Sequence, residues 1–322
     1  MEILKFKPIY KETIWGGGRI AAIKGDTAQY GKTIGESWEI STMDGNVSVI
    51  SGGSMDGKDL REAIAEMKGR LVGDGVYAEY CTELPILVKF IDAVQDLSIQ
   101  VHPDDRKAVE LGYTRGKTEM WYLVDTSGNA TIRIGLEREM TPAVYKELVE
   151  SGDICKAIGN YAAEPRDCFF IPAGTVHSIG AGCLVAEIQQ SSDVTFRIYD
   201  FDRRDSSGNK RQLHTEEAAA SIDYRVGKDY LRRGYPASEN GTKLVESPFF
   251  NTYVYGVNGK SVVNLGGINS FMAVVCTEGE GSLRADNGET VGIRRGECAL
   301  VPAEASLLEV CGSLKFLGTY VP

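Results

Sequence analysis

Two of the three histidines in this 322-residue chain lie in motifs that could present them to a metal ion. His102 lies in the motif SIQVHPDD, and His177 ends the motif PAGTVH. Glu119 begins an apolar run between them, and Gln100 precedes His102 by two residues. Because alternate residues of a β-strand point to the same face, Gln100 and His102 share one side of their predicted strand. Imidazole, carboxylate and carboxamide groups on separate strands are enough to hold one divalent ion.

This pattern alone does not select the metal. Zinc takes nitrogen and oxygen ligands in near-tetrahedral geometry, and two histidines with a carboxylate also suit Fe(II), Mn or Co. The third histidine, His214, follows a charged loop and precedes a helical segment, so we expect a surface or helix-entry residue. The charge run over residues 200–205 is expected to be a solvated loop.

Composition excludes several classes of function. The net charge is -10 with a pI of about 5.0, and no basic stripe is present, so nucleic acid is not an expected partner. No apolar run approaches the roughly 18 residues of a membrane-spanning helix, and the N-terminus lacks a signal core. We therefore expect a cytoplasmic protein without a membrane partner. An anionic substrate would need a local cationic pocket against the negative field of the chain.

The apolar patterning predicts a mainly β chain with a few short helices. Thirty-seven glycines favour many tight turns. Strands are predicted over residues 84–93, 97–102, 119–124, 168–172, 183–189 and 195–199. Helices are predicted over residues 58–72, about 103–111, 141–150 and 215–222, with Thr141 as the N-cap and Pro142 at the first helical position of the third. Residues 228–242 are polar and read as a linker.

A short internal repeat indicates two related β units. The stretch RDCFFIPA at 166–173 is echoed by RGECALVPA at 295–303. Five residues past the proline the first copy has His177, whereas the second has Leu307. We therefore predict an N-terminal catalytic domain over 1–235 and a C-terminal β domain without a metal site over 236–322.

The metal-ligand motifs belong to a set that resembles one family. The motifs SIQVHPDD, GKTEMW and PAGTVH are similar to signature segments of the type I mannose-6-phosphate isomerases (phosphomannose isomerases). So are EIQQSSDVTFR, ETIWGG and GESWE. These segments occur in the order of the family between residues 12 and 203.

The resemblance implies a fold and a metal centre. It implies two cupin-type (jelly-roll) β-barrel units with one zinc ion per chain, held by Gln100, His102, Glu119 and His177. It also implies that Arg197 is catalytic. Larger members carry a helical insertion between the glutamate and the second histidine. Only 58 residues (177 − 119) separate them here, so the chain resembles the short bacterial form. A monomer or a homodimer is expected.

The implied reaction interconverts D-mannose 6-phosphate and D-fructose 6-phosphate through an enediol(ate). Arg197 is always protonated, which suits stabilising the enediolate or the phosphate of this hexose 6-phosphate. Glu187 is our first candidate for the base, with Asp193 or a metal-bound water as alternatives. Lys117 and Ser98, which share faces with metal ligands, are candidates for contacting the substrate, as is Asp193.

Two other functions remain open at this point. One is another metal-dependent cupin enzyme, such as an epimerase or oxygenase. The other is a non-catalytic protein that binds sugar phosphates. Trp15 and Trp38 are expected to be wall or core aromatics rather than reacting groups.

Overall fold

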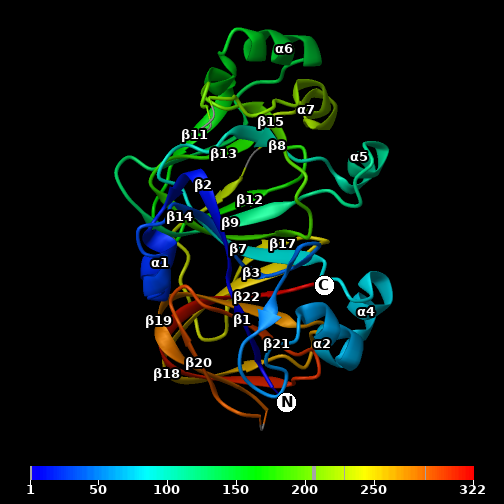
Figure 1. Ribbon diagram of the computed structural model, residues 1–322, viewed down its shortest axis with the longest axis vertical. Coiled ribbons are helices and arrows are strands. Elements are labelled where there is room, and N and C mark those ends of the chain that lie inside the picture. Colours follow the sequence, from blue (N-terminus) through cyan, green and yellow to red (C-terminus); the bar gives the residue numbers. More distant parts are fainter. Residues whose placement is uncertain (1, 205–207, 228, 287) are drawn as a thin grey trace.

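The structure is a computed structural model that describes residues 2–204, 208–227, 229–286 and 288–322. Two β units are stacked along its long axis, the N-terminal unit above and the C-terminal unit below (Figure 1). The prediction of a mainly β fold is confirmed, and the two units are compatible with the predicted pair of barrels.

Two facing sheets build the N-terminal unit. The seven-stranded sheet has the order β16 (Leu231–Arg232), β12 (Cys168–Ile171), β9 (Glu119–Thr126), β14 (Cys183–Gln190), β7 (Ile86–Asp92), β3 (Ile34–Ile40) and β2 (Ile9–Gly17). The five-stranded sheet has the order β11 (Ile158–Ala162), β10 (Thr131–Leu136), β13 (His177–Ile179), β8 (Ile99–Val101) and β15 (Phe196–Tyr199). A small hairpin pairs β4 (Thr42–Met43) with β5 (Asn46–Val47).

The C-terminal unit is an eight-stranded sheet that also takes strands from the start of the chain. Its order is β17 (Thr242–Glu246), β18 (Asn251–Asn264), β22 (Leu307–Tyr320), β19 (Met272–Ala285), β21 (Cys298–Val301), β1 (Leu4–Lys7) and β6 (Val49–Ile50), with β20 (Val291–Arg294) beside β19. The domain boundary between residues 235 and 236 stays a prediction. Strand β1, from the predicted N-terminal domain, pairs with β21 and so belongs to the sheet of the C-terminal unit.

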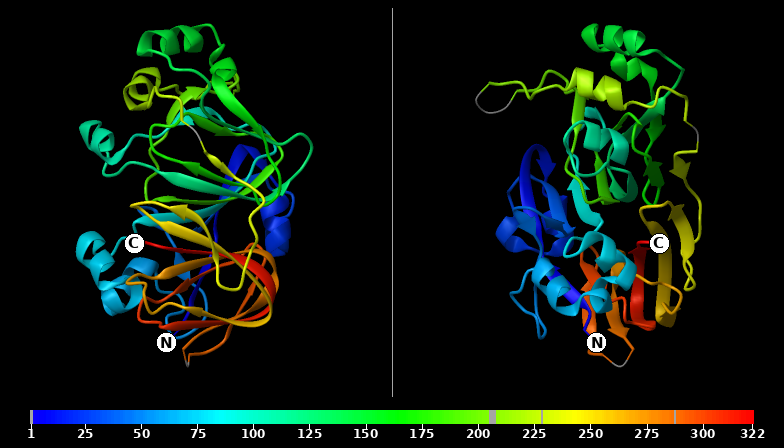
Figure 2. Two further views of the ribbon diagram at one scale, coloured as in Figure 1. Left: turned by 180° about the vertical axis from the view of Figure 1, so that it is seen from behind. Right: turned by 90° about the vertical axis from the view of Figure 1, so that its right-hand side faces the viewer.

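Short helices lie around the sheets (Figure 2). They are α1 (Arg19–Lys24), α2 (Leu60–Met67), α3 (Gly69–Val72), α4 (Asp74–Tyr80), α5 (Asp105–Glu110), α6 (Pro142–Glu150) and α7 (Thr215–Ser221), with 3-10 turns at η1 (Thr27–Gln29) and η2 (Ile154–Ala157). At α6 the predicted cap is confirmed, because the Thr141 hydroxyl accepts the Val144 amide and Pro142 opens the helix. No helix within the described ranges is long and apolar enough to span a bilayer.

The helix predicted over residues 58–72 is interrupted. Lys68 has φ 54° and separates α2 from α3. The break lets the α3 carbonyls face the C-terminal unit, where Leu71 O accepts the Ala303 amide and Val72 O accepts the Phe271 amide. The apolar stripe predicted one continuous helix, but the hydrogen bonds to the C-terminal unit favour two separate helices.

The predicted linker over residues 228–242 is more ordered than expected. Outside residue 228, which is not described, it contains β16, which pairs with β12. Arg233 follows and binds the buried carboxylate of Asp167 through Nε at 2.6 Å. This segment therefore extends the seven-stranded sheet rather than hanging free between units.

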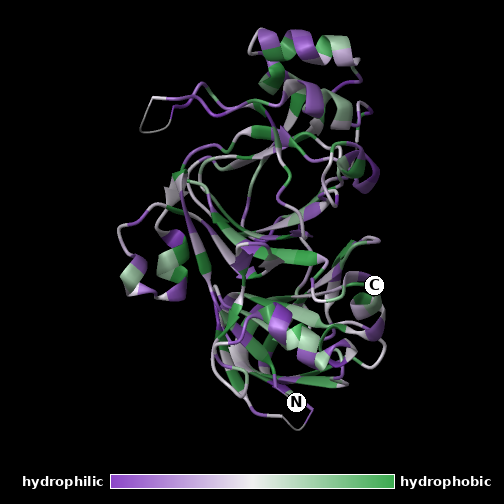
Figure 3. Ribbon diagram, turned by 45° about the vertical axis from the view of Figure 1, so that its right-hand side comes forward, coloured by the Kyte–Doolittle hydropathy of each residue, from purple (hydrophilic) through white to green (hydrophobic). Residues whose placement is uncertain are grey.

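The seven-stranded sheet is buried on both faces. One face packs against the five-stranded sheet, with Trp121, Val185 and other side chains in a shared apolar cluster. The other face carries Tyr122 and Ile188 into a second cluster that includes residues of the C-terminal unit. Apolar segments accordingly run through the middle of both units (Figure 3). Alternate residues of β7, β9 and β14 thus face either the second sheet or the second unit.

The C-terminal core gives a stability test. Phe316 is fully buried and stacks on Tyr255 with ring centroids 4.8 Å apart. Phe316→Ala should lower the free energy of unfolding by about 3–5 kcal/mol, because it removes apolar burial and leaves a cavity. Val262→Ala, on the neighbouring β18 at 48% exposure, should cost less than about 1 kcal/mol. Urea unfolding would measure both, and equal midpoints would contradict the assignment of this core.

Candidate active site

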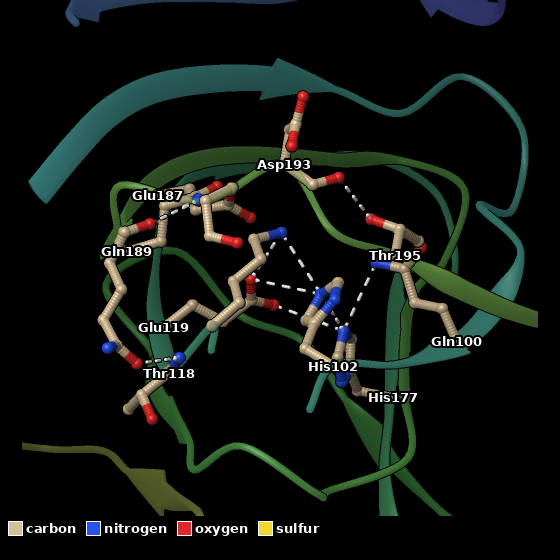
Figure 4. Close-up of polar contacts among 12 residues, drawn as sticks. Gln100, His102, Thr118, Glu119, His177, Glu187, Gln189, Asp193 and Thr195 are labelled. Carbon is tan, nitrogen blue, oxygen red and sulfur yellow. Dashed lines mark hydrogen bonds and ion pairs between the residues drawn. The ribbon is translucent and has the colours of Figure 1, made fainter. Parts of the chain in front are cut away.

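Three predicted ligands meet at the head of two sheets (Figure 4). His102 follows β8, His177 begins β13 and Glu119 begins β9, so the group joins both sheets of the N-terminal unit. The two Nε2 atoms lie 3.2 Å apart, and His177 Nε2 lies 3.3 Å from Glu119 Oε1. Within the described part of the chain, this is the one group of at least three His, Cys, Asp or Glu side chains placed to hold a metal ion.

Both imidazole rings are oriented by backbone carbonyls. His102 Nδ1 lies 2.8 Å from Val194 O, and His177 Nδ1 lies 2.8 Å from Thr175 O. A carbonyl can only accept, so each Nδ1 carries the proton and each Nε2 presents a lone pair to the centre. Burial lowers the pKa of both rings, that of His177 to about 4, which keeps them neutral. Two lone pairs facing each other at this distance fit a shared cation.

The carboxylate of Glu119 is fully buried beside these rings. Its Oε2 lies 2.9 Å from Lys117 Nζ, yet neither carboxylate oxygen accepts a hydrogen bond of good geometry from the described residues. Burial raises the pKa of Glu119, and Lys117 opposes that shift. Because a buried carboxylate without hydrogen bonds is costly, its free lone pairs also fit a divalent metal ion.

Gln100, the fourth predicted ligand, reaches the same centre. It is the Cα partner of His177 across β8 and β13, and its Nε2 lies 3.3 Å from His177 Nε2. A half-turn of the carboxamide would bring Oε1 to that position, since the two ends of an amide have the same shape. The residues present therefore fit a metal ion with two nitrogen and two oxygen ligands.

A cavity of about 500 Å³ opens beside this group. Its basic lining residues are Lys89, Lys117, Arg197 and Arg211. Glu36, Glu187 and Asp193 line it too, so the cations exceed the carboxylates by one (4 − 3) in a chain of net charge -10, and an anionic ligand would depend on these local cations. Trp15 and Trp38 also line it, which agrees with their expected place as wall residues.

A row of polar side chains crosses the sheet face beneath the cavity. Glu187 pairs in register with Lys89 on β7 and with Trp121 on β9. Its Oε2 accepts the Trp121 Nε1–H at 2.8 Å, and its Oε1 lies 3.2 Å from Lys89 Nζ. Burial alone would raise the pKa of Glu187, but Lys89, Lys117 and the Trp121 hydrogen bond hold it below its usual range. Glu187 is therefore an ionised carboxylate held in place.

The other residues predicted for the substrate also reach the cavity. Ser98 and Asp193 line it, together with Gln100, Lys117, Glu187 and Arg197. Lys117 Nζ lies 3.2 Å from His102 Nε2, so its side chain points to the metal ligands as predicted. All nine predicted site residues thus lie in the cavity wall or in the ligand group behind it.

Arg197 is positioned by His214, the histidine to which the sequence analysis gave no role in the site. The Arg197 amide donates to His214 Nδ1 at 3.2 Å, and the His214 amide donates to Arg197 O at 2.8 Å. His214 precedes α7, as expected for a helix-entry residue. Burial lowers its pKa, and the nearby charge of Arg197 adds to the effect. The neutral ring therefore keeps its lone pair for the Arg197 amide.

Sequence reasoning missed three charged residues of the cavity lining. Lys89 interrupts the apolar run of β7, and a lysine inside a buried strand was a usable signal. Glu36, 3.6 Å from Lys89 Nζ, lies in the GESWE motif but was given no role, and Arg211 lies in a polar segment that gave no signal.

The expectation that residues 200–205 form a solvated loop is wrong for Asp200. Asp200 is 5% exposed and its carboxylate binds two arginines, Arg203 and Arg211. Residue 205 lies outside the described residues. Charge density alone does not reveal that opposite charges within one loop pair with each other.

Comparisons with known proteins agree with the fold and show the family. The model of the catalytic domain of type I phosphomannose isomerases matches residues 3–147, and that of the mannose-6-phosphate isomerase cupin domain matches residues 240–321. The chain belongs to the type I phosphomannose isomerase family.

Individual relatives cover nearly the whole chain. A mannose-6-phosphate isomerase of Streptococcus mutans is 33% identical over 95% of this chain and 94% of its own length. The mannose-6-phosphate isomerase ManA of Bacillus subtilis is 34% identical over 94% and 93%. A crystal structure of the Bacillus subtilis mannose 6-phosphate isomerase superposes with a TM-score of 0.87 at 29% identity, covering 99% of each chain.

The ligand group gives a metal-binding test. Glu119→Gln keeps the shape of the side chain but removes its charge. We expect metal affinity to fall at least about tenfold, since even the loss of an outer hydrogen-bond partner costs about 10–100-fold. Calorimetric titration with Zn²⁺ and elemental analysis after dialysis would measure the change.

Glu187→Gln is the matched control, because Glu187 lies in the same cavity wall without joining the ligand group. It should bind metal as the unaltered chain does. Equal affinities in the Glu119 and Glu187 variants would remove Glu119 from the ligand set.

Proposed function

We propose that this protein is a zinc-dependent aldose–ketose isomerase that interconverts D-mannose 6-phosphate and D-fructose 6-phosphate. The observation that carries the proposal is the buried group of His102, Glu119 and His177 beside a cavity with basic walls. Family membership and relatives named mannose-6-phosphate isomerase support the substrate. A hexose phosphate is charged and does not cross membranes freely, so we place the reaction in the cytoplasm.

Zinc fits the donor set, and the resemblance to the family favours it over other divalent ions. Two neutral imidazoles, a carboxylate and a carboxamide would be its ligands, namely His102, His177, Glu119 and Gln100. When bound, the ion would act as a Lewis acid on the carbonyl and hydroxyl oxygens of the open-chain sugar.

Arg197 would stabilise negative charge as it develops on the sugar. It lies on β15, where it is the Cα partner of Gln100 on β8, so the arginine and a ligand occupy adjacent strands. Its Nη1 donates to Gln212 O at 2.9 Å, while its buried Nε has no hydrogen-bond partner among the described residues. A guanidinium fixed at the cavity wall can stabilise a developing oxyanion with little reorganisation.

Glu187 is our candidate for the base, with Asp193 as the alternative. Glu187 is ionised and held at the cavity face by Trp121 and Lys89. Lys89 would keep this carboxylate in its charged form, since its ammonium lies 3.2 Å away. Lys117 and Ser98 would contact substrate oxygens from the same wall.

A coupled assay tests the proposed reaction. Mannose 6-phosphate should be converted to fructose 6-phosphate, and prior treatment with a chelator should lower the rate at least about 100-fold, because Lewis-acid polarisation is worth several kcal/mol. Zn²⁺ should restore the rate. Turnover should persist without oxygen, which separates this isomerase from a cupin oxygenase. Absence of turnover with zinc bound would refute the proposal.

The role of Arg197 has its own test. Arg197→Ala should retain zinc and lose about 10²–10³-fold in kcat, the range for losing one donor to a developing oxyanion. Arg106→Ala, whose side chain is 82% exposed on α5, should be unaffected. Steady-state kinetics with metal analysis would measure both, and full activity in Arg197→Ala would exclude a catalytic role.

A further inference from the structure

The segment between β15 and α7 folds back on itself beside the cavity. Arg204 and Lys210 form an antiparallel bridge, so the two limbs of the segment lie side by side. Asp200, at the base of one limb, is buried and faces both arginines that flank the bridge. The fold-back therefore brings Arg211 to the cavity from a position 14 residues (211 − 197) after Arg197.

Asp200 binds the two arginines differently. Arg211 makes a two-bond contact, with Nε donating to Oδ2 at 2.7 Å and Nη2 donating to Oδ1. Arg203 also binds Oδ1, and its Nη1 donates to Asp96 O at 2.5 Å. Of the two, only Arg211 is a lining residue of the cavity.

The guanidinium group of Arg211 is held in place by Asp200, and one of its nitrogens makes no hydrogen bond to the described residues. Asp200 takes the Nε and Nη2 edge, and Nη1 has no hydrogen-bond partner within the described residues. Arg197 lines the same cavity. Burial lowers the pKa of Arg197, and the positive charge of Arg211 is the next largest cause that lowers it. Two guanidinium groups are thus held near each other although they repel.

We infer that Arg211, held by Asp200, binds the phosphate of the sugar phosphate and so selects phosphorylated over neutral hexoses. This inference rests on the proposed function, since the phosphate belongs to that substrate. A phosphate monoester carries about −1.5 to −2 charges at pH 7, and guanidinium groups bind it through charge-assisted hydrogen bonds. Such a dianion would relieve the repulsion between Arg211 and Arg197. The Asp200 brace fixes the guanidinium before the substrate arrives, which lowers the entropic cost of binding.

The test separates substrate binding from chemistry. Arg211→Gln should raise KM for mannose 6-phosphate about 10- to 100-fold, because a hydrogen bond to a charged group is lost. Its kcat should stay within about threefold of the unaltered enzyme, since the phosphate does not react. The inhibition constant of inorganic phosphate should rise by a similar factor. Arg211→Lys, which keeps the charge without the fork, should give an intermediate KM.

Arg203→Gln is the matched control, because it removes the other arginine from the same Asp200 carboxylate. Its KM and phosphate inhibition should stay near those of the unaltered enzyme. An unchanged KM in Arg211→Gln, or the same rise in Arg203→Gln, would overturn the inference in favour of a loop-stabilising role.

Direct binding keeps the inference independent of turnover. Calorimetric titration of the metal-loaded protein with inorganic phosphate should show weaker binding in Arg211→Gln than in Arg203→Gln. If the enzyme turns over mannose 6-phosphate but the two variants bind phosphate equally, this inference fails and the proposed function stands. If there is no turnover but phosphate binding depends on Arg211, the proposed function fails and the anion site stands.

Discussion

Two hydrogen bonds from ring Nδ1–H groups to backbone carbonyls govern the site. The carbonyls of Val194 and Thr175 fix the tautomer of His102 and His177, and thereby aim both Nε2 lone pairs at one point. Those carbonyls belong to loops that the two sheets hold in place. The two lone pairs favour a bound cation, as does the buried carboxylate of Glu119, which contacts Lys117 Nζ at 2.9 Å but accepts no hydrogen bond of good geometry from the described residues.

Buried charged side chains of opposite sign lie next to one another in the cavity wall, which lowers the cost of burying them. Glu187, Lys89 and Glu36 follow one another across neighbouring strands, with ion contacts of 3.2 and 3.6 Å at Lys89. Lys117 and Glu119 repeat the pattern at 2.9 Å. Any one of these charges buried alone would cost several kcal/mol. The alternation supplies both an ionised acid and fixed cations without a large net charge in the wall.

The sequence predicted the site better than it predicted the surroundings of the site. His102 and His177 could be found because the chain has only three histidines and these two stand in predicted strand motifs, whereas the full ligand set with Glu119 came from the resemblance to the family. Arg211 could not be found, because it reaches the cavity only when the charged segment folds back onto Asp200. The helix break at Lys68 was not predicted for a similar reason, since the segment after it is held by hydrogen bonds such as that from the Ala303 amide to Leu71 O, 232 residues (303 − 71) apart in the chain. Local patterns record local preferences, and these contacts are not local.

The C-terminal unit contributes to the site by covering the back of its sheet. On β9, Trp121 lines the cavity and Glu119 belongs to the ligand group behind it, while Met120 and Tyr122 pack in the core shared with the C-terminal unit. Without that cover the apolar residues of β7, β9 and β14 would meet water on one face, and the register that aligns Glu187 with Lys89 and Trp121 would lose its support. The second unit has Leu307 at the start of β22, where the repeat would place a histidine like His177 at the start of β13. A unit that serves as a structural backing needs no ligand there, so the repeated strand pattern can be kept while its metal chemistry is not.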